Sequence, residues 1–123
     1  MKPDRELLKT AYREFNARNI DAVLALMQPD VDWPNAMENR REIGVENVRE
    51  YWTRQWQVLD PHVDPVGFSD DSEGRTIVDV HQVVKDREGK VLVDQIVQHV
   101  YTIRDGLIQR MEIRQETAVP QEP

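Results

Sequence analysis

Two polar residues, Gln95 and His99, interrupt an otherwise apolar face of the segment Val91–Ile103. Because side chains alternate along a strand, both would point toward the core with that face. Buried polar groups need partners, which protein, water or a ligand can supply. An unperturbed imidazole titrates near neutral pH, so His99 could act as acid or base, although burial would favour its neutral form. Gln95 could hold a ligand oxygen. His99 is the candidate acid–base group, and the alternative is a structural histidine satisfied by Thr76, Gln95 or water.

Further ligand-binding candidates are aromatic and amide residues expected to face the same interior space. Asn35 could donate and accept hydrogen bonds, although a cap or turn role would explain it equally well. Trp33 could stack on a flat ligand at a pocket mouth, whereas Trp56 is more simply core filler. An aromatic, sparsely polar set of this kind is typical of a small-molecule pocket. The residues expected to line it are Tyr12, Trp33, Asn35, Trp52, Trp56, Gln95, His99 and Tyr101.

The elements that must position these residues begin with three helices. Helical spacing of apolar residues predicts them at about residues 3–15, 20–27 and 45–59. A short strand, Val31–Asn35, lies between the second and third helices, and Ala36–Gly44 is predicted to be a loop. A weak strand around Val63–Phe68 contains Pro65 and Gly67, which indicates an edge strand or a bulge.

The second half of the chain predicts an antiparallel meander. Thr76–Lys85 is a β-branched strand, and pairing Lys85 with Lys90 would set Thr76 opposite His99. The same pairing would set His81 opposite Asp94 on the other face. Three helices followed by such a meander predict an α+β fold.

The final hairpin joins Val91–Ile103 to Leu107–Ile113 through Arg104, Asp105 and Gly106. A two-residue Asp-Gly loop would set apolar residues against charged ones. A three-residue loop instead aligns the two apolar faces and sets His99 opposite Met111. The sequence therefore favours the three-residue loop.

Composition limits the classes of function. The 123 residues predict one domain, residues 1–116, followed by a frayed tail, residues 117–123. The net charge of −7 disfavours nucleic acid. No apolar run approaches the roughly 18 residues of a membrane span. The three histidines lie on separate elements and the chain has no cysteine, so no metal or other cofactor is expected. The lack of cysteine also favours the cytoplasm as the predicted location.

The outer face of the predicted sheet carries more apolar residues than a plain solvent surface would. Leu92, Ile96 and Val100 lie on it among polar side chains. This face is therefore a candidate oligomer interface.

The whole pattern resembles the SnoaL-like branch of the nuclear transport factor 2 (NTF2-like) superfamily. The resemblance rests on the helix followed by Asn16–Asp21, on Pro29–Asn35, on the helix with Tyr51-Trp52 and on the hairpin Tyr101–Met111, and it spans roughly residues 5–115. It implies a cone-shaped barrel in which three N-terminal helices pack in the concave face of a curved, mostly antiparallel sheet. It also implies a pocket inside the cone and a dimer through the outer sheet face. Family members include polyketide cyclases, ketosteroid isomerases, dehydratases, hydrolases and binding domains.

The residues depart from the family's enzymes. Steroid isomerases use a carboxylate on the short strand after the second helix, where this chain has Asn35. Their helical tyrosine corresponds to Ala11, with Tyr12 beside it, and their acid on the sheet corresponds to His99. Polyketide cyclases use an aspartate on the sheet, where the nearest candidates are His99 and Gln95.

Three hypotheses follow. The first is a domain that binds a small, largely apolar ligand in an internal pocket, without an assured reaction. The second is a cofactor-independent isomerase, cyclase or dehydratase that acts on an apolar carbonyl compound, with His99 as the acid–base group and Asn35 or Gln95 holding the oxygen. The third is an interaction protein whose pocket is filled by its own side chains.

Overall fold

The computed structural model describes residues 3–115, so the predicted tail 117–123 lies outside the described residues. The helices are α1 (Pro3–Asn16), α2 (Ile20–Leu24) and α3 (Val45–Val58). The strands are β1 (Met27–Asn35), β2 (Arg40–Ile43), β3 (Leu59–Asp70), β4 (Thr76–Asp86), β5 (Val91–Arg104) and β6 (Leu107–Gln115).

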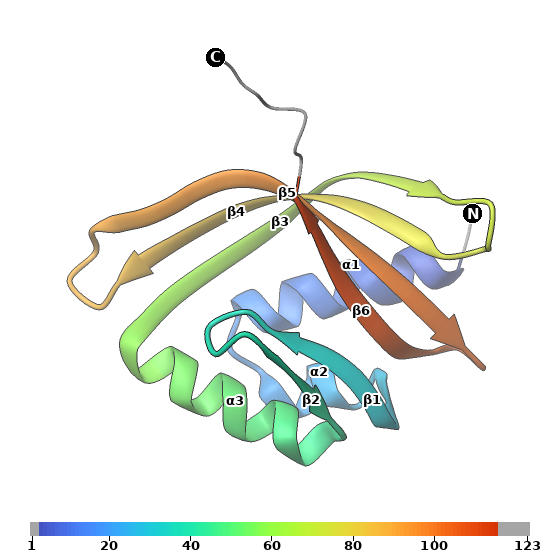
Figure 1. Ribbon diagram of the computed structural model, residues 1–123, viewed down its shortest axis with the longest axis horizontal. Helices are drawn as coiled ribbons and strands as arrows, with labels where there is room; N and C mark the ends of the chain where they lie inside the picture. The colour runs from blue at the N-terminus through green and yellow to red at the C-terminus, as the bar shows by residue number, and fades with distance from the viewer. Residues whose placement is uncertain (1–2, 116–123) are drawn as a thin grey trace.

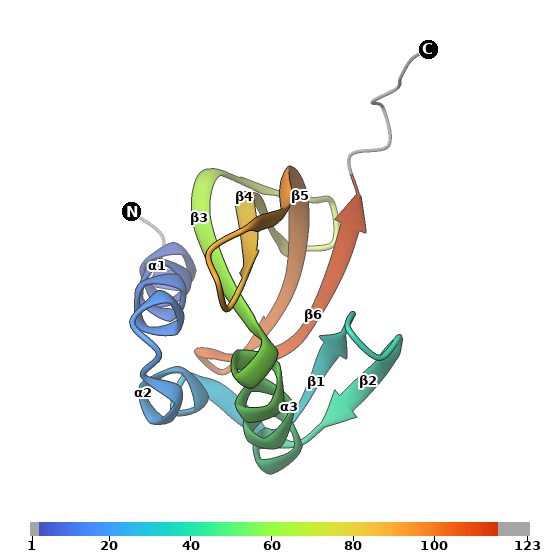
Figure 2. The ribbon, with the colours of Figure 1, turned by 90° about the vertical axis from the view of Figure 1, so that its left-hand side faces the viewer.

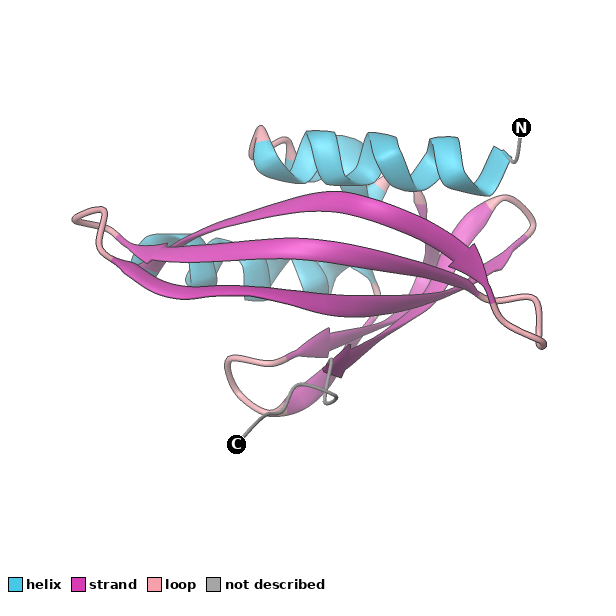
Figure 3. Ribbon diagram, turned by 90° about the horizontal axis from the view of Figure 1, so that it is seen from above, coloured by secondary structure: helices cyan, strands magenta, loops and turns pink. Residues whose placement is uncertain are grey.

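The strands form one curved, open sheet in the order β2-β1-β6-β5-β4-β3 (Figure 1). The β1–β6 pair is parallel, and the other neighbours are antiparallel. Figure 2 shows the sheet curving around the space that α1 and α3 border, and Figure 3 shows α1 lying along one side of it. The predicted α+β cone fold with a mostly antiparallel sheet is confirmed.

Apolar stripes on the helices explain how the layers pack. Leu8 on α1 and Val48 on α3 are fully buried, as the helical spacing predicted. They join sheet residues such as Val80 and Val97 in one core. The space between helices and sheet is therefore fixed by a shared hydrophobic core.

The region between α2 and α3 differs from the prediction. Strand β1 begins at Met27 rather than Val31, and the expected loop contains strand β2, which pairs with β1. Three of the four residues of β2 are charged, Arg40, Arg41 and Glu42, so the strand carries no hydrophobic signal. Charged residues are common on edge strands because they discourage pairing with other chains.

The β5–β6 hairpin turns through two residues, Asp105 and Gly106, and the predicted three-residue loop is wrong. Both turn residues have positive φ, 54° and 78°, as a type I′ turn requires. An irregularity between Thr102 and Ile103 then shifts the register. This shift aligns the apolar faces that the longer loop was invoked to align.

The register of the last two strand pairs also differs from the prediction. His99 lies opposite Ile113 on β6, not Met111, and opposite Val78 on β4. Thr76 lies opposite Tyr101. A shift near the β4–β5 turn moves each residue to another partner, but the same side chains still face the interior.

Strand β3 is the edge of the sheet opposite β2, and its pairing with β4 shifts between Pro65 and Gly67. The prediction of an edge strand or bulge there is confirmed.

At the outer face, Leu92 and Ile96 are 49% and 44% exposed, but Val100 is only 2% exposed. Val100 therefore cannot contribute to an outer surface in the way we predicted. Within the described residues, no helix is long and apolar enough to cross a bilayer.

Candidate functional site

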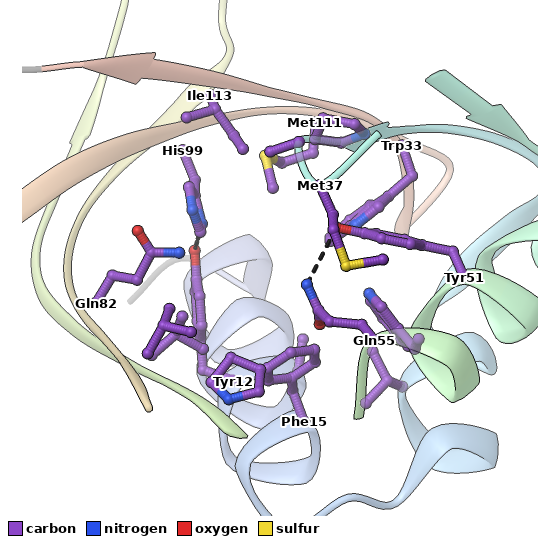
Figure 4. A pocket seen from close by; sticks show the side chains of 18 of the residues that line it. Tyr12, Phe15, Trp33, Met37, Tyr51, Gln55, Gln82, His99, Met111 and Ile113 are labelled. Carbon is purple, nitrogen blue, oxygen red and sulfur yellow. Dashed lines mark hydrogen bonds between the residues drawn. The ribbon is translucent and has the colours of Figure 1, made fainter. Parts of the chain in front are cut away.

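An internal cavity of about 290 Å³ lies between the helices and the sheet (Figure 4). Most of its lining is apolar or aromatic, drawn from α1, α3 and the strands on both sides. These lining residues are Ala11, Phe15, Val23, Trp33, Pro34, Ala36, Met37, Trp52, Leu59, Pro61, Val63, Val84, Val93, Ile108, Met111 and Ile113. The hypothesis of an interior filled by its own side chains is therefore not supported.

The polar lining is small and uncharged. Its members are Tyr12, Tyr51, Gln55, Gln82, His99 and Tyr101. No Asp, Glu, Lys or Arg of the described residues lines the cavity. The part of the chain that the structure describes also has no cluster of three His, Cys, Asp or Glu side chains able to hold a metal.

Two tyrosines and a histidine form a hydrogen-bonded chain in this lining. The Tyr101 hydroxyl donates to the Tyr12 oxygen at 2.8 Å, and the Tyr12 oxygen lies 2.7 Å from Nδ1 of His99. The Tyr12 and His99 rings are nearly parallel, at 16° and 5.8 Å between centroids. Tyr12 comes from α1 and the other two from β5, so the chain joins the helical layer to the sheet (Figure 4).

Burial keeps the hydrogen-bonded groups of Tyr101, Tyr12 and His99 uncharged near neutral pH. It lowers the pKa of His99 to about 4, because removing water penalises the imidazolium ion. Burial likewise raises the pKa of Tyr12 and of Tyr101 above that of a free phenol. The site therefore offers neutral hydrogen-bonding groups and no fixed ion.

Two glutamines extend the polar lining in different directions. The Gln82 oxygen accepts from Nε2 of Gln95 at 3.0 Å, and the Gln55 amide donates to the Tyr51 hydroxyl at 3.1 Å. Figure 4 shows Gln82 beside the Tyr12–His99 pair and Gln55 near Met37 and Tyr51. Of these residues Tyr51, Gln55 and Gln82 line the cavity, and we predicted none of the three.

The alternation that identified Gln95 on β5 also applies to β4. Gln82 shares a face with the buried Val78, Val80 and Val84, so the same reasoning could have found it. Gln55 lies one helical turn after Trp52, which placed it beside the predicted stripe. These two were available in the sequence and were overlooked.

The structure brings together five of the eight predicted site residues. Tyr12, Trp33, Trp52, His99 and Tyr101 line the cavity. The rings of Trp33 and Trp52 meet edge to face at 5.6 Å, which gives the cavity one aromatic wall. Their contact with a ligand stays a prediction.

Asn35 does not line the cavity. Its side chain is 1% exposed, and its amide donates to Glu42 at 2.7 Å and to Glu38 at 2.9 Å. Its oxygen accepts from the backbone N–H of Glu38 at 2.9 Å. Asn35 therefore organises the turn between β1 and β2, the alternative role given for it above.

Trp56 and Gln95 also lie outside the lining. Trp56 stacks on Trp52 at 5.9 Å, and the Arg18 guanidinium covers it at 4.9 Å. Gln95 does not line the cavity, but its amide donates a hydrogen bond to Gln82, which does. Trp56 supports the aromatic wall from behind, and Gln95 orients the Gln82 amide.

Comparison with known proteins agrees with this geometry. The sequence model of the SnoaL-like domain family matches residues 8–111. No curated protein matches the sequence.

Solved structures match nearly the whole chain. The crystal structure of TerC co-crystallised with polyporic acid has a TM-score of 0.80 at 27% identity, covering 95% of this chain and 94% of TerC. An NTF2-like protein of unknown function from Burkholderia pseudomallei gives 0.81 at 21%, covering 96% and 94%. A proposed polyketide cyclase from Pseudomonas putida gives 0.78 at 17%, covering 96% and 94%. The last two, at such low identity, show the fold alone.

Proposed function

Because the chain belongs to the SnoaL-like domain family, we propose that it binds a small, largely apolar ligand in its internal cavity. The observation that carries this proposal is the cavity itself, about 290 Å³ with a mostly apolar and aromatic lining. Ligand pockets have this character and begin at about this size, roughly 300 Å³. The similar structure of TerC, which was co-crystallised with polyporic acid, supports the same use of the fold.

The lining favours binding over catalysis. Isomerases and cyclases of this fold move protons with a carboxylate, and no described carboxylate lines this cavity. Asn35, which takes the place of the isomerase base, is engaged by Glu38 and Glu42 away from the lining. His99 accepts protons poorly near neutral pH, since burial lowers its pKa to about 4. The alternative of a His99-dependent reaction is therefore not favoured.

A matched pair of substitutions on β5 tests the binding site. Val93 lines the cavity, whereas Val91 is exposed near the start of the same strand. Val93→Phe should fill part of the cavity and weaken binding of 2-acetylnaphthalene, a small neutral probe, at least about tenfold, because the ring occupies the ligand's volume. Isothermal titration calorimetry measures the affinity, and Val91→Phe is the control. Equal affinities for the two variants and the unsubstituted protein would place the ligand elsewhere.

We also infer that two copies associate through the outer face of β4 and β5. Leu92 and Ile96 are exposed there, and alternation along β5 puts them on the face opposite Val93, which lines the cavity. Sedimentation at micromolar concentration should show a dimer, which Leu92→Glu with Ile96→Glu should convert to a monomer by burying charge at the contact. Val66→Glu, on the exposed edge strand β3, is the control. If the unsubstituted protein were a monomer, the role of Leu92 and Ile96 in association would be refuted. The cytoplasmic location stays a prediction.

A further inference from the structure

One nitrogen of His99 remains available to a ligand. His99 lines the cavity and is only 6% exposed, and Nδ1 is taken by Tyr12. Its other ring nitrogen, Nε2, has no hydrogen-bond partner among the described residues, yet it is not sealed in protein as Nε1 of Trp56 is. A buried polar group in this condition needs a partner from the cavity.

The tyrosine chain determines which nitrogen carries the proton. Tyr101 donates to the Tyr12 oxygen, so the acceptor described for the Tyr12 proton is Nδ1 of His99. A neutral imidazole has one proton, and a nitrogen that accepts a hydrogen bond cannot hold it. The proton is therefore on Nε2, and His99 presents an N–H donor to the cavity.

The neighbouring groups select the charge of the partner. Gln82 gives its oxygen to Gln95, which leaves its NH₂ as the group it can offer to the cavity. This second donor lies beside the Tyr12–His99 pair (Figure 4). No described ion lines the cavity, so a charged ligand would lose its hydration without gaining a counter-ion.

Building on the proposed function, we propose that the ligand is a neutral aromatic ketone or related carbonyl compound whose oxygen accepts a hydrogen bond from Nε2–H of His99. Its flat body lies against the wall formed by Trp33 and Trp52. Tyr12 is a positioning residue that fixes the His99 tautomer.

Three probes of similar shape test the proposal: 2-acetylnaphthalene, its hydrocarbon analogue 2-isopropenylnaphthalene, and 2-naphthoate. Calorimetry at pH 7 gives each dissociation constant, and the hydrocarbon-to-ketone ratio cancels the shared apolar burial. His99→Phe should reduce this ratio about tenfold, the net effect of one hydrogen bond, while keeping hydrocarbon affinity. Tyr12→Phe should reduce the same ratio several-fold, because Nδ1 of His99 loses its donor and the Nε2–H tautomer is no longer fixed. Retained hydrocarbon binding shows that each variant still forms the cavity.

Other results would overturn the inference. The ratio could stay constant in both variants, or 2-naphthoate could bind most tightly with uptake of a proton, which would indicate an imidazolium ion facing an anion. Nitrogen NMR gives a second measurement, in which His99 should show the Nε2–H tautomer at pH 7, with His62→Gln to aid assignment. An Nδ1–H tautomer would contradict the proposal. If none of the probes bound, the proposed function itself would fail, and this inference with it.

Discussion

His99 and His81 lie on neighbouring strands, on opposite faces of one sheet, and each makes a side-chain hydrogen bond of 2.7 Å. His99 is 6% exposed and bonds to Tyr12, whereas the His81 side chain is 41% exposed and bonds to Asp94. Two hydrogen bonds of equal length therefore lie in opposite environments, one buried and one exposed to solvent. Burial keeps the inner imidazole neutral, whereas solvent weakens any ion pair on the outer face. The contact length alone does not tell what a histidine contributes.

The largest expected difference comes from removing each imidazole. His99→Ala should lower the free energy of unfolding by about 3 to 4 kcal/mol, because it leaves a void and an unpaired Tyr12 hydroxyl. His81→Ala should cost no more than about 1 kcal/mol, since the pair is exposed. Urea unfolding at one fixed protein concentration measures both. Similar losses for the two variants would contradict the comparison.

The next effect is on the pH dependence of stability. The pKa of His99 is lowered to about 4 in the folded state against 6.5 in the unfolded state, so the unfolded chain binds more protons between these values. Stability from neutral His99 is then complete above pH 6.5 and falls as the pH drops toward 4, by about 3 kcal/mol in total.

Unfolding at pH 7.5 and pH 4 in the unsubstituted protein and in His99→Gln isolates this contribution from the carboxylates. The decrease should be smaller in the variant by about 3 kcal/mol. An identical decrease in both proteins would mean that His99 is already protonated, or already hydrated, in the folded state.

A smaller effect distinguishes the two tyrosines behind His99. Tyr12→Phe removes the donor to Nδ1 and the acceptor of Tyr101, so it should cost about 2 kcal/mol of unfolding free energy. Tyr101→Phe removes only the outer hydroxyl and should cost about 1 kcal/mol. Thermal unfolding ranks the pair, and the reverse order would place the critical hydrogen bond at Tyr101.

Strand alternation and helical spacing predicted the parts of the site that depend on one element at a time. They placed His99 and Tyr101 on the inner face of β5 and Tyr12 on the buried side of α1, and the structure puts all three in the cavity lining. They could not predict that Tyr12 meets His99, because that contact joins residues 87 positions apart. A pattern along one element contains no information about such a partner.

Asn35 shows a different limit. Its orientation depends on Glu42, which lies on β2, and a short charged edge strand has no apolar alternation to reveal it. Without β2, the carboxylate that attracts the Asn35 amide had no place in the predicted fold. Registers failed for a related reason, since the shifts at Thr102–Ile103 and Val84–Lys85 leave the apolar pattern unchanged.

The parallel pairing of β1 with β6 has a consequence for synthesis. Met27 pairs with Ile108, and the Ile108 N–H also donates to the Leu26 carbonyl, so β1 is completed by β6, the last described strand. A ribosome releases the N-terminal part first, and contacts of such long sequence separation form slowly. The edge of β1 that pairs with β6 must therefore stay unpaired until β6 has emerged, and an unpaired strand edge can pair with other chains in the meantime.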